Sequence, residues 1–298
     1  MERIEFEVLS ACAEGIDFTL QKENLHYSES DVQQTKINLE RKELLNGDTV
    51  TEQGLKELEP YRVKRVVFLA AGFGSRMVPI TINTPKPMVR VNGKRIIETL
   101  IDAAIGAGIS DIYIVRGYLG EQFELLQRKY PNIRLVDNPD YDGTGTISSF
   151  YYAKELLENA YVMESDLVLK NPKIIRRYHY CSDFMGTRVD GTDDWYFRTE
   201  DNGHITEIGV GGSGKNCYKL IGISYWNKED GRRLADDIRT AYESPEGRNL
   251  PMSFIPFRVF RDQYRVQIMP CRESDIIEID SFEELQVYDK AYQIHSSK

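Results

Sequence analysis

A glycine turn with two basic residues behind it is the part of this sequence best suited to chemistry. It begins after the apolar run 66–71, where Gly72 and Gly74 open a G-x-G-[ST]-R pattern. Arg76 completes that pattern, and Lys86 follows ten residues later. Because glycine has no β-carbon, backbone N–H groups can approach phosphate oxygens closely, while the side chains supply positive charge. The pattern predicts a nucleoside triphosphate site at the carboxyl end of a strand.

Two other glycine patterns point to different nucleotide folds, and both fail on specific residues. A dinucleotide-binding turn needs a third glycine where this chain has Met77, so a Rossmann dehydrogenase is not expected. The segment 209–215 fits G-x-x-x-x-G-K, but Asn216 stands where a P-loop needs Ser or Thr. Residues 218–226 read as a strand, whereas a P-loop must open a helix. We therefore predict a hairpin or loop at 209–215.

The composition is that of an ordinary globular protein. The 298 residues are enough for two domains. No run of about 18 apolar residues is present, and the N-terminal residues are acidic where a signal peptide would be basic. We therefore expect a cytoplasmic protein without a membrane segment. Cys12, Cys181, Cys217 and Cys271 have no C-x-x-C spacing, which favours reduced thiols over a disulfide framework or a zinc site.

The net charge of -9 is concentrated near the N-terminus. Residues 1–62 contain 7 Lys and Arg against 14 Asp and Glu, a net of -7, which leaves 31 basic and 33 acidic residues in the remainder. Pro60 precedes a short link at 61–64 rather than a long flexible tether. We predict two domains, at 1–62 and 63–298, that stay close together.

The N-terminal domain has a helical pattern interrupted by a turn signal. Ser30 and Gln33 form a capping box at the start of a helix. Helices are expected at 2–13, 30–45 and 52–58, with a turn at 46–48. This order resembles a winged helix-turn-helix domain of the multiple-antibiotic-resistance regulator type.

A DNA-reading helix would have to be basic, and the expected recognition helix at 30–45 is not. Three acidic residues balance three basic ones along it. The strongly negative domain as a whole also opposes binding to phosphates. DNA is therefore not an expected partner. A structural, dimerising or regulatory role is favoured, which leaves a homodimer open.

The larger domain alternates between strand-like and helix-like segments. The strand-like segments are 66–71, 112–116, 133–137 and 160–164, and the helix-like ones are 96–107, 120–129 and 146–157. This alternation predicts an α/β domain, with a mainly parallel, Rossmann-like sheet and helices on both faces. The active site is then expected at the carboxyl ends of the strands, where the glycine turn lies.

Four motifs give this domain a specific resemblance. They are the turn at 69–88, Val-Arg-Gly-Tyr-Leu at 115–119, Glu-Ser-Asp-Leu at 164–167 and Ile-Glu-Ile-Asp-Ser at 277–281. With them, residues 63–292 resemble nucleotidyltransferases of the sugar-phosphate nucleotidyltransferase superfamily, in particular the small cytidylyltransferases that act on phosphocholine and related head groups. The resemblance implies transfer of a cytidylyl group from CTP to a small phosphate or phosphonate, with release of pyrophosphate.

Two aspartates are expected to meet at one edge of the sheet. Asp166 follows the apolar segment 161–163, and Asp280 follows 276–279. Bringing an anionic acceptor to the α-phosphorus requires neutralisation of charge, and two converging carboxylates suit Mg²⁺. The resemblance likewise makes Asp166 and Asp280 the metal ligands.

The resemblance also assigns the basic residues. Lys86 is expected to contact the phosphates near the bond that breaks, and Arg76 with the turn amides to contact the β- and γ-phosphates. Together with Asp166 and Asp280 they form the expected catalytic set, which acts by alignment and electrostatic stabilisation. The expected nucleotide-binding residues are Leu69, Ala70, Ala71, Gly72, Gly74, Ser75, Arg76, Lys86, Gly117 and Tyr118.

The sequence departs from the choline-type pattern where the head group should bind. An Asn-Asn pair is replaced by Asp-Gly-Thr-Gly-Thr at 142–146, and a Tyr-Trp-acid cluster by Leu-Pro-Met-Ser-Phe at 250–254. The first of these, with Glu-Ser-Asp-Leu, resembles the 2-aminoethylphosphonate cytidylyltransferases, which we favour. Trp195 could still stack on a trimethylammonium group, so phosphocholine is the alternative. The expected substrate-binding residues are Thr144, Gly145, Thr146, Glu164 and Trp195.

A nucleotide-sensing transcriptional regulator is a second alternative. It would require loss of a metal ligand or of the phosphate-binding lysine, whereas Arg76, Lys86, Asp166 and Asp280 are all present. Catalysis is therefore favoured, with CTP as the nucleotide on the resemblance alone.

Overall fold

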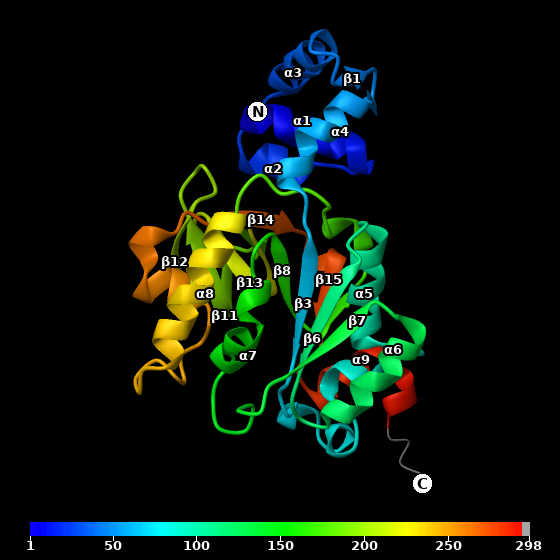
Figure 1. Cartoon of the computed structure of the whole chain (residues 1–298), viewed down its shortest axis with the longest axis vertical. Helices are drawn as coiled ribbons and strands as arrows, with labels where there is room; N and C mark the ends of the chain where they lie inside the picture. Colours follow the sequence, from blue (N-terminus) through cyan, green and yellow to red (C-terminus); the bar gives the residue numbers. More distant parts are fainter. Residues whose placement is uncertain (294–298) are drawn as a thin grey trace.

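The computed structural model describes residues 1–293, which form two parts stacked along the long axis of the molecule (Figure 1). The elements of the smaller, N-terminal part are α1 (Arg3–Glu14), α2 (Thr19–Asn24), α3 (Glu29–Arg41), β1 (Leu45–Asn46), β2 (Thr49–Val50) and α4 (Glu52–Leu58). Phe6, Leu9 and Leu39 lie in its buried core, so α1 and α3 pack directly against each other.

The predicted helices and turn of the N-terminal part are confirmed, but the start of α3 differs. Ser28 Oγ accepts from the N–H of Asp31 (3.1 Å), and the Asp31 carboxylate accepts from the N–H of Ser28 (2.8 Å). The predicted Ser30–Gln33 capping box is therefore wrong, because this earlier reciprocal pair already caps the helix. The helix also ends at Arg41 rather than at 45, since the chain turns there into the β1–β2 hairpin. The winged-helix identity stays a prediction.

The larger part is built on a nine-stranded sheet. Its strands are β3 (Arg65–Ala70), β6 (Asp111–Arg116), β7 (Ile133–Asp137), β8 (Ala160–Glu164), β10 (Asp183–Arg188), β11 (Gly191–Thr199), β12 (Ile205–Ser213), β13 (Cys217–Trp226) and β14 (Gln267–Cys271). They run in the order β12-β11-β13-β8-β3-β6-β7, with β10 pairing with both β13 and β14. The neighbours from β8 to β7 are parallel, whereas β13, β11 and β12 add antiparallel pairs.

Helices cover both faces of this sheet (Figure 1). The helices are α5 (Ile96–Gly106), α6 (Glu124–Lys129), α7 (Ile147–Ala153) and α8 (Lys228–Tyr242). Ile101 of α5 and Leu126 of α6 belong to one core, whereas Phe150 of α7 and Leu234 of α8 belong to another. The predicted α/β fold is confirmed. Its antiparallel half was not predicted, because the strand–helix alternation in the sequence stops at β8.

The remaining elements lie outside the main sheet. They are the pair β4 (Arg90–Val91) and β5 (Lys94–Arg95), the pair β9 (Leu167–Leu169) and β15 (Ile276–Glu278), and α9 (Phe282–Tyr288). The glycine-rich segment 209–215 forms the end of β12 and the turn into β13. Because β11 lies between β12 and β13 in the sheet, this segment is a connecting loop rather than a hairpin, and the loop alternative is confirmed. The P-loop interpretation is excluded, since a strand and not a helix follows. No helix in the described part of the chain is long and apolar enough to cross a membrane.

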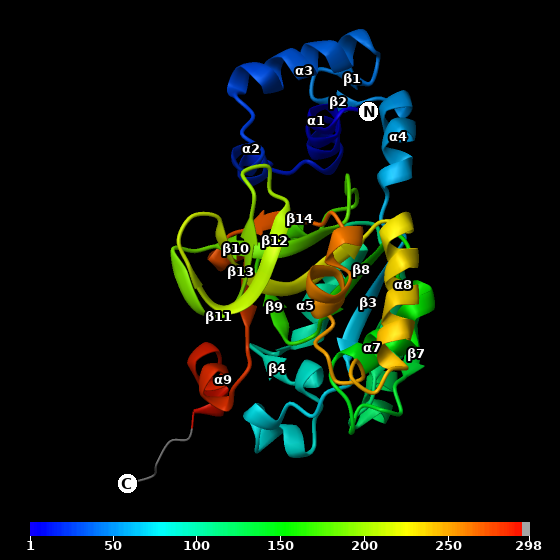
Figure 2. The ribbon, with the colours of Figure 1, turned by 90° about the vertical axis from the view of Figure 1, so that its left-hand side faces the viewer.

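The two parts are joined by buried polar contacts. The side chain of Arg176 is only 2% exposed, and it donates to Glu14 Oε2 (3.0 Å) and Ser10 Oγ (2.9 Å) of α1. Figure 2 shows α2 facing the end of the sheet that holds β14, where Gln21 Nε2 lies 3.2 Å from the sulfur of Met269. The N-terminal part is thus docked on the sheet rather than tethered beside it. The domain boundary at 62/63 stays a prediction.

We expect Arg176→Ala to lower the free energy of unfolding by about 3–5 kcal/mol, because it leaves the buried carboxylate of Glu14 without its cation and that of Glu7 with Arg3 alone. Urea denaturation measures this change. Arg232→Ala removes an exposed ion pair with Glu158 and should cost less than about 1 kcal/mol. Equal costs for the two variants would show that Arg176 is not a buried anchor.

Candidate active site

The glycine turn opens a cleft of about 690 Å³ next to the carboxyl ends of β3 and β8. Gly74 has a φ of +61°, and a β-carbon there would lie 2.9 Å from Cβ of Lys86, so the tight turn requires glycine. The predicted residues that line the cleft are Leu69, Ala70, Ala71, Gly72, Gly74, Ser75, Arg76, Lys86, Gly145, Thr146, Glu164, Asp166, Trp195 and Asp280. Most of the predicted site is therefore brought together.

Lys86 lies between the two predicted aspartates. Its ammonium is 2.8 Å from Asp166 Oδ2 and 2.5 Å from Asp280 Oδ1. Arg76 approaches the same Asp280 oxygen at 2.9 Å, with most of its side chain exposed. Burial disfavours the charged amine, but the two carboxylates outweigh this effect and raise the pKa of Lys86. The lysine therefore stays charged at the base of the cleft.

The two aspartates meet through a small ladder rather than through the main sheet. Asp166 lies between β8 and β9, and Asp280 follows β15 after one intervening residue. β9 and β15 pair antiparallel, with Leu167 opposite Glu278, and the N–H of Ile279 donates to the carbonyl of Asp166 (3.2 Å). The prediction that both strands end at one sheet edge is therefore wrong in its geometry. The predicted convergence of the carboxylates is confirmed.

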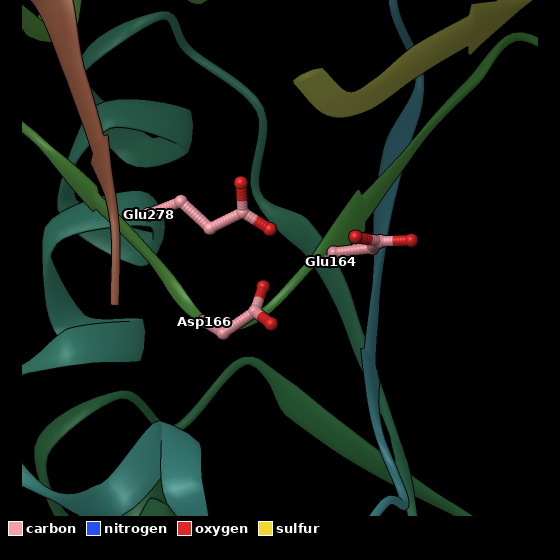
Figure 3. Close-up of side chains that lie close together, drawn as sticks. All are labelled: Glu164, Asp166 and Glu278. Carbon is pink, nitrogen blue, oxygen red and sulfur yellow. The ribbon is translucent and has the colours of Figure 1, made fainter. Parts of the chain in front are cut away.

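Three carboxylates gather beside Lys86 (Figure 3). One oxygen each of Glu164, Asp166 and Glu278 lies within 4.8 Å of the others, and Asp166 and Glu278 face each other. Gly222 on β13 makes the space, because a β-carbon there would overlap the Glu164 carboxylate. Burial, followed by repulsion from the neighbouring carboxylates, raises the pKa of Glu164 well above its usual range and that of Glu278 to about 7. The three carboxylates are thus close enough for each to oppose the ionisation of the others.

The acid cluster has the chemistry of a site for a divalent cation. Asp166 Oδ1 is buried and has no hydrogen-bond partner within residues 1–293. Carboxylate oxygens are the ligands that Mg²⁺ prefers in proteins. Glu164, Asp166 and Glu278 could hold such an ion, whereas the predicted ligand Asp280 is engaged with Lys86 and Arg76.

Sequence reasoning missed Glu278 as a site residue. It precedes Asp280 by two residues, as Glu164 precedes Asp166, so each strand end carries the pattern Glu-x-Asp. This repeated pattern was the available signal. It has meaning only once β9 and β15 are known to pair, because that pairing places the two motifs side by side.

The two places where the sequence leaves the choline-type pattern touch each other. The N–H of Met252 donates to Thr146 Oγ1 (3.4 Å), and a β-carbon at Gly145 would lie 3.1 Å from the carbonyl oxygen of Asn249. These residues line one wall of the cleft, and Trp195 also lines it. The departures thus form a single surface, although about 100 residues separate them.

Three predicted binding residues do not line the cleft. Gly117 packs under the ring of Tyr141, and the Tyr118 N–H donates to the carbonyl of Ala71 (3.1 Å). The Tyr118 hydroxyl lies 3.0 Å from the carbonyl oxygens of Thr81 and Ile82, so this residue supports the nucleotide loop from behind. Thr144 is also turned away, because its hydroxyl donates to the carbonyl of Asp140 (2.7 Å).

The comparisons with known proteins agree with this arrangement. Residues 45–199, just over half of the chain, match the family model for the MobA-like NTP transferase domain. A 2-aminoethylphosphonate cytidylyltransferase of Lancefieldella rimae is 37% identical over 229 residues, which cover 76% of this chain and 92% of that protein. A choline-phosphate cytidylyltransferase of Streptococcus pneumoniae is 36% identical over 182 residues, which cover 61% of this chain and 78% of that protein.

The solved structures give the same result. The CTP:phosphocholine cytidylyltransferase of Streptococcus pneumoniae superposes with a TM-score of 0.70 at 33% identity, over 78% of this chain and all of that one. An inositol-1-phosphate CTP transferase of T. maritima, with a TM-score of 0.62 at 16% identity, shares the fold. The chain therefore belongs to the MobA-like NTP transferase family and is a nucleotidyltransferase.

Proposed function

We propose that this chain is a Mg²⁺-dependent cytidylyltransferase that couples CTP to 2-aminoethylphosphonate and releases pyrophosphate. The observation that carries the proposal is Lys86, held between Asp166 and Asp280 beside the glycine turn, in a cleft that also contains Trp195 and Thr146. The names of the relatives in Lancefieldella rimae and Streptococcus pneumoniae support the cytidylyl group and a small zwitterionic acceptor.

The reaction needs anions to be held and aligned, and the cleft has the groups to do so. The amides of the turn from Gly72 and the side chain of Arg76 would bind the β- and γ-phosphates. Lys86 would exchange its carboxylate partners for the phosphates near the bond that breaks, which stabilises the developing charge. An acceptor oxygen then attacks the α-phosphorus, and pyrophosphate leaves.

A bound Mg²⁺ would supply charge neutralisation between the acceptor and the α-phosphate. Asp166 and Glu278 are placed to hold it, with Glu164 alongside and Asp280 available once Lys86 turns to the phosphates. None of these side chains has to act as a nucleophile. Their contribution is to position the reactants and to exclude competing charge from the cleft.

The cleft wall at which the acceptor is expected favours a primary ammonium over a trimethylammonium group. This wall consists of Gly145, Thr146, Asn249, Met252 and Trp195. A quaternary ammonium requires several open aromatic faces. Of the aromatic residues that line the cleft within residues 1–293, Phe150 and Phe184 are buried in the core. Phe254 meets the edge of Trp195 and has Arg258 3.8 Å from the centre of its ring. Trp195 is thus left as the aromatic surface, so phosphocholine remains the alternative acceptor and CDP-choline the alternative product.

The N-terminal part supports a structural role better than DNA reading. Lys36 of α3 is paired with Asp48 at 2.6 Å, and Lys42 just after that helix is paired with Glu5 at 2.5 Å. Their charges are therefore compensated within the domain and offer little to a phosphate backbone. This makes a nucleotide-sensing regulator the weaker alternative, and it leaves a homodimer open.

A pyrophosphate-release assay tests the proposed activity. We expect turnover with CTP, Mg²⁺ and 2-aminoethylphosphonate, and weaker or no turnover with ATP, GTP or UTP. The acceptor panel also contains phosphocholine, phosphoethanolamine and a sugar 1-phosphate. Turnover with the sugar phosphate and none with any CTP and head-group combination would make the cytidylyltransferase assignment wrong.

Lys86→Ala and Asp280→Ala should each lower kcat by about 10²–10³-fold, because each removes a charge that aligns the phosphates. Thermal unfolding should change much less than activity does. Asp201→Ala, which removes an exposed ion pair with Lys215 outside the cleft, serves as the control and should keep full activity. Near-wild-type activity of either cleft variant would remove that residue from the catalytic set.

Removal of divalent metal with EDTA should abolish turnover, and added Mg²⁺ should restore it, because the acid cluster is otherwise short of positive charge. Isothermal titration calorimetry of Mg²⁺ in the presence of CTP measures the site directly. We expect Asp166→Asn to weaken this binding, whereas undiminished turnover in EDTA would overturn the proposed metal dependence.

A further inference from the structure

Lys219 is a cation at the cleft that the proposed chemistry leaves unused. It lies on β13, next to the cleft-lining Leu220, and its side chain is 36% exposed. Its ammonium lies 3.0 Å from Asp194 Oδ2 and 3.9 Å from Glu278 Oε2, two carboxylates that line the cleft. A partly exposed ammonium with two carboxylates beside it carries its charge.

Asp194 is held in place for this contact. It lies on β11, which pairs antiparallel with β13, and its Oδ1 accepts from the N–H of Trp195 (2.7 Å). Its other oxygen faces Lys219. A positive and a negative group therefore lie side by side, with the ammonium next to Glu278 of the acid cluster and the carboxylate bonded to the backbone of Trp195.

The charges of the cleft show why this pair matters. Within residues 1–293, the charged residues that line the cleft are five carboxylates and two cations, namely Glu164, Asp166, Asp194, Glu278 and Asp280 against Arg76 and Lys86. Lys219 does not line the cleft but borders it through Asp194 and Glu278, and with it the formal difference is two negative charges. A triphosphate would occupy Arg76 and Lys86. Of these three cations, Lys219 is the one then left for the anionic end of an acceptor.

We propose that Lys219 and Asp194 bind the two ends of a zwitterionic acceptor, Lys219 its phosphonate or phosphate and Asp194 its ammonium. This inference rests on the proposed function and identifies the acceptor subsite within it. Binding exchanges one internal ion pair for two intermolecular ones, so no charge is left without a partner. An acceptor that lacks one of the charges leaves either Lys219 or Asp194 without a partner. The unpaired charge lowers the affinity of the site for that acceptor strongly.

The orientation follows from the surroundings of the pair. Lys219 is on the side of Glu278 and the candidate metal cluster, where the attacking oxygen has to be. Asp194 is joined to Trp195, whose ring lines the cleft and offers a face to the cationic end. The pair can therefore bind 2-aminoethylphosphonate and phosphocholine alike. The aromatic surface of Trp195 distinguishes between their cationic ends.

Steady-state kinetics with single variants and a one-charge probe test this assignment. The probe is ethylphosphonate, which has the phosphonate but no ammonium, measured as a competitor of the acceptor. Lys219→Met should weaken ethylphosphonate binding about tenfold, the value of one charge-assisted hydrogen bond. The KM for CTP should stay within about twofold, since Arg76 and Lys86 remain available to the triphosphate. Lys219→Arg should restore most of the loss.

Asp194→Asn should give the opposite selectivity. The KM for 2-aminoethylphosphonate should rise about tenfold, while inhibition by ethylphosphonate should not weaken, because that probe has no ammonium to lose and no longer leaves Asp194 uncompensated. Lys215→Met, in the loop just before β13 but paired with Asp201 away from the cleft, is the matched control and should behave as wild type. Thermal unfolding of each variant shows that the fold is kept.

The outcomes separate this inference from the proposed function. If the wild-type protein uses 2-aminoethylphosphonate or phosphocholine but Lys219→Met keeps the wild-type affinity for ethylphosphonate, the assignment of Lys219 is wrong and the proposed function stands. An equal loss for CTP and acceptor, or no rescue by Lys219→Arg, also overturns it. If the wild-type protein accepts only a sugar phosphate, both fail together.

Discussion

The site depends on one buried cation held between two carboxylates. Lys86 arrives from the loop after β3, Asp166 from the end of β8 and Asp280 from β15, so three distant segments meet at one ammonium group. The two carboxylates compensate this ammonium in a partly desolvated place, where an unpaired charge would be costly. The glycine at position 74, the β9–β15 ladder and the loop supports at Thr81 and Tyr118 all serve to bring this ammonium to its place.

The same contact compensates opposite charges inside the cleft. Carboxylates that would later face a metal ion, and cations that would later face phosphates, neutralise each other in the meantime. The compensation is incomplete, because five carboxylates line the described part of the cleft against the two cations Arg76 and Lys86. Substrate binding then exchanges ion pairs rather than burying new charges, which lowers its desolvation cost.

Local patterns in the sequence predicted most of the fold, and long-range pairing accounts for what they missed. The glycine turn, the strand–helix alternation and the two aspartates are contiguous signals, so β3 to β8 and the core of the site were predicted. Glu278 and Lys219 belong to the site only because β15 pairs with β9 and β13 with β11. Tyr118 was misplaced for a related reason, since a motif position does not tell which way its side chain turns. The cap at Ser28 was missed because Ser30 offered a competing pattern two residues away.

The N-terminal part reaches the far wall of the cleft through the strands it rests on. Asn24 of α2 accepts from the hydroxyl of Tyr218 (2.9 Å), the residue before Lys219 on β13, while Gln21 contacts Met269 on β14. β14 in turn leads through residues 272–275 into β15 and Glu278. α2 thus contacts the strand that carries Lys219 and the strand that leads into β15, where Glu278 lies. These contacts, together with the pairing of Lys36 and Lys42 inside the N-terminal part, give that part a structural role at this end of the sheet.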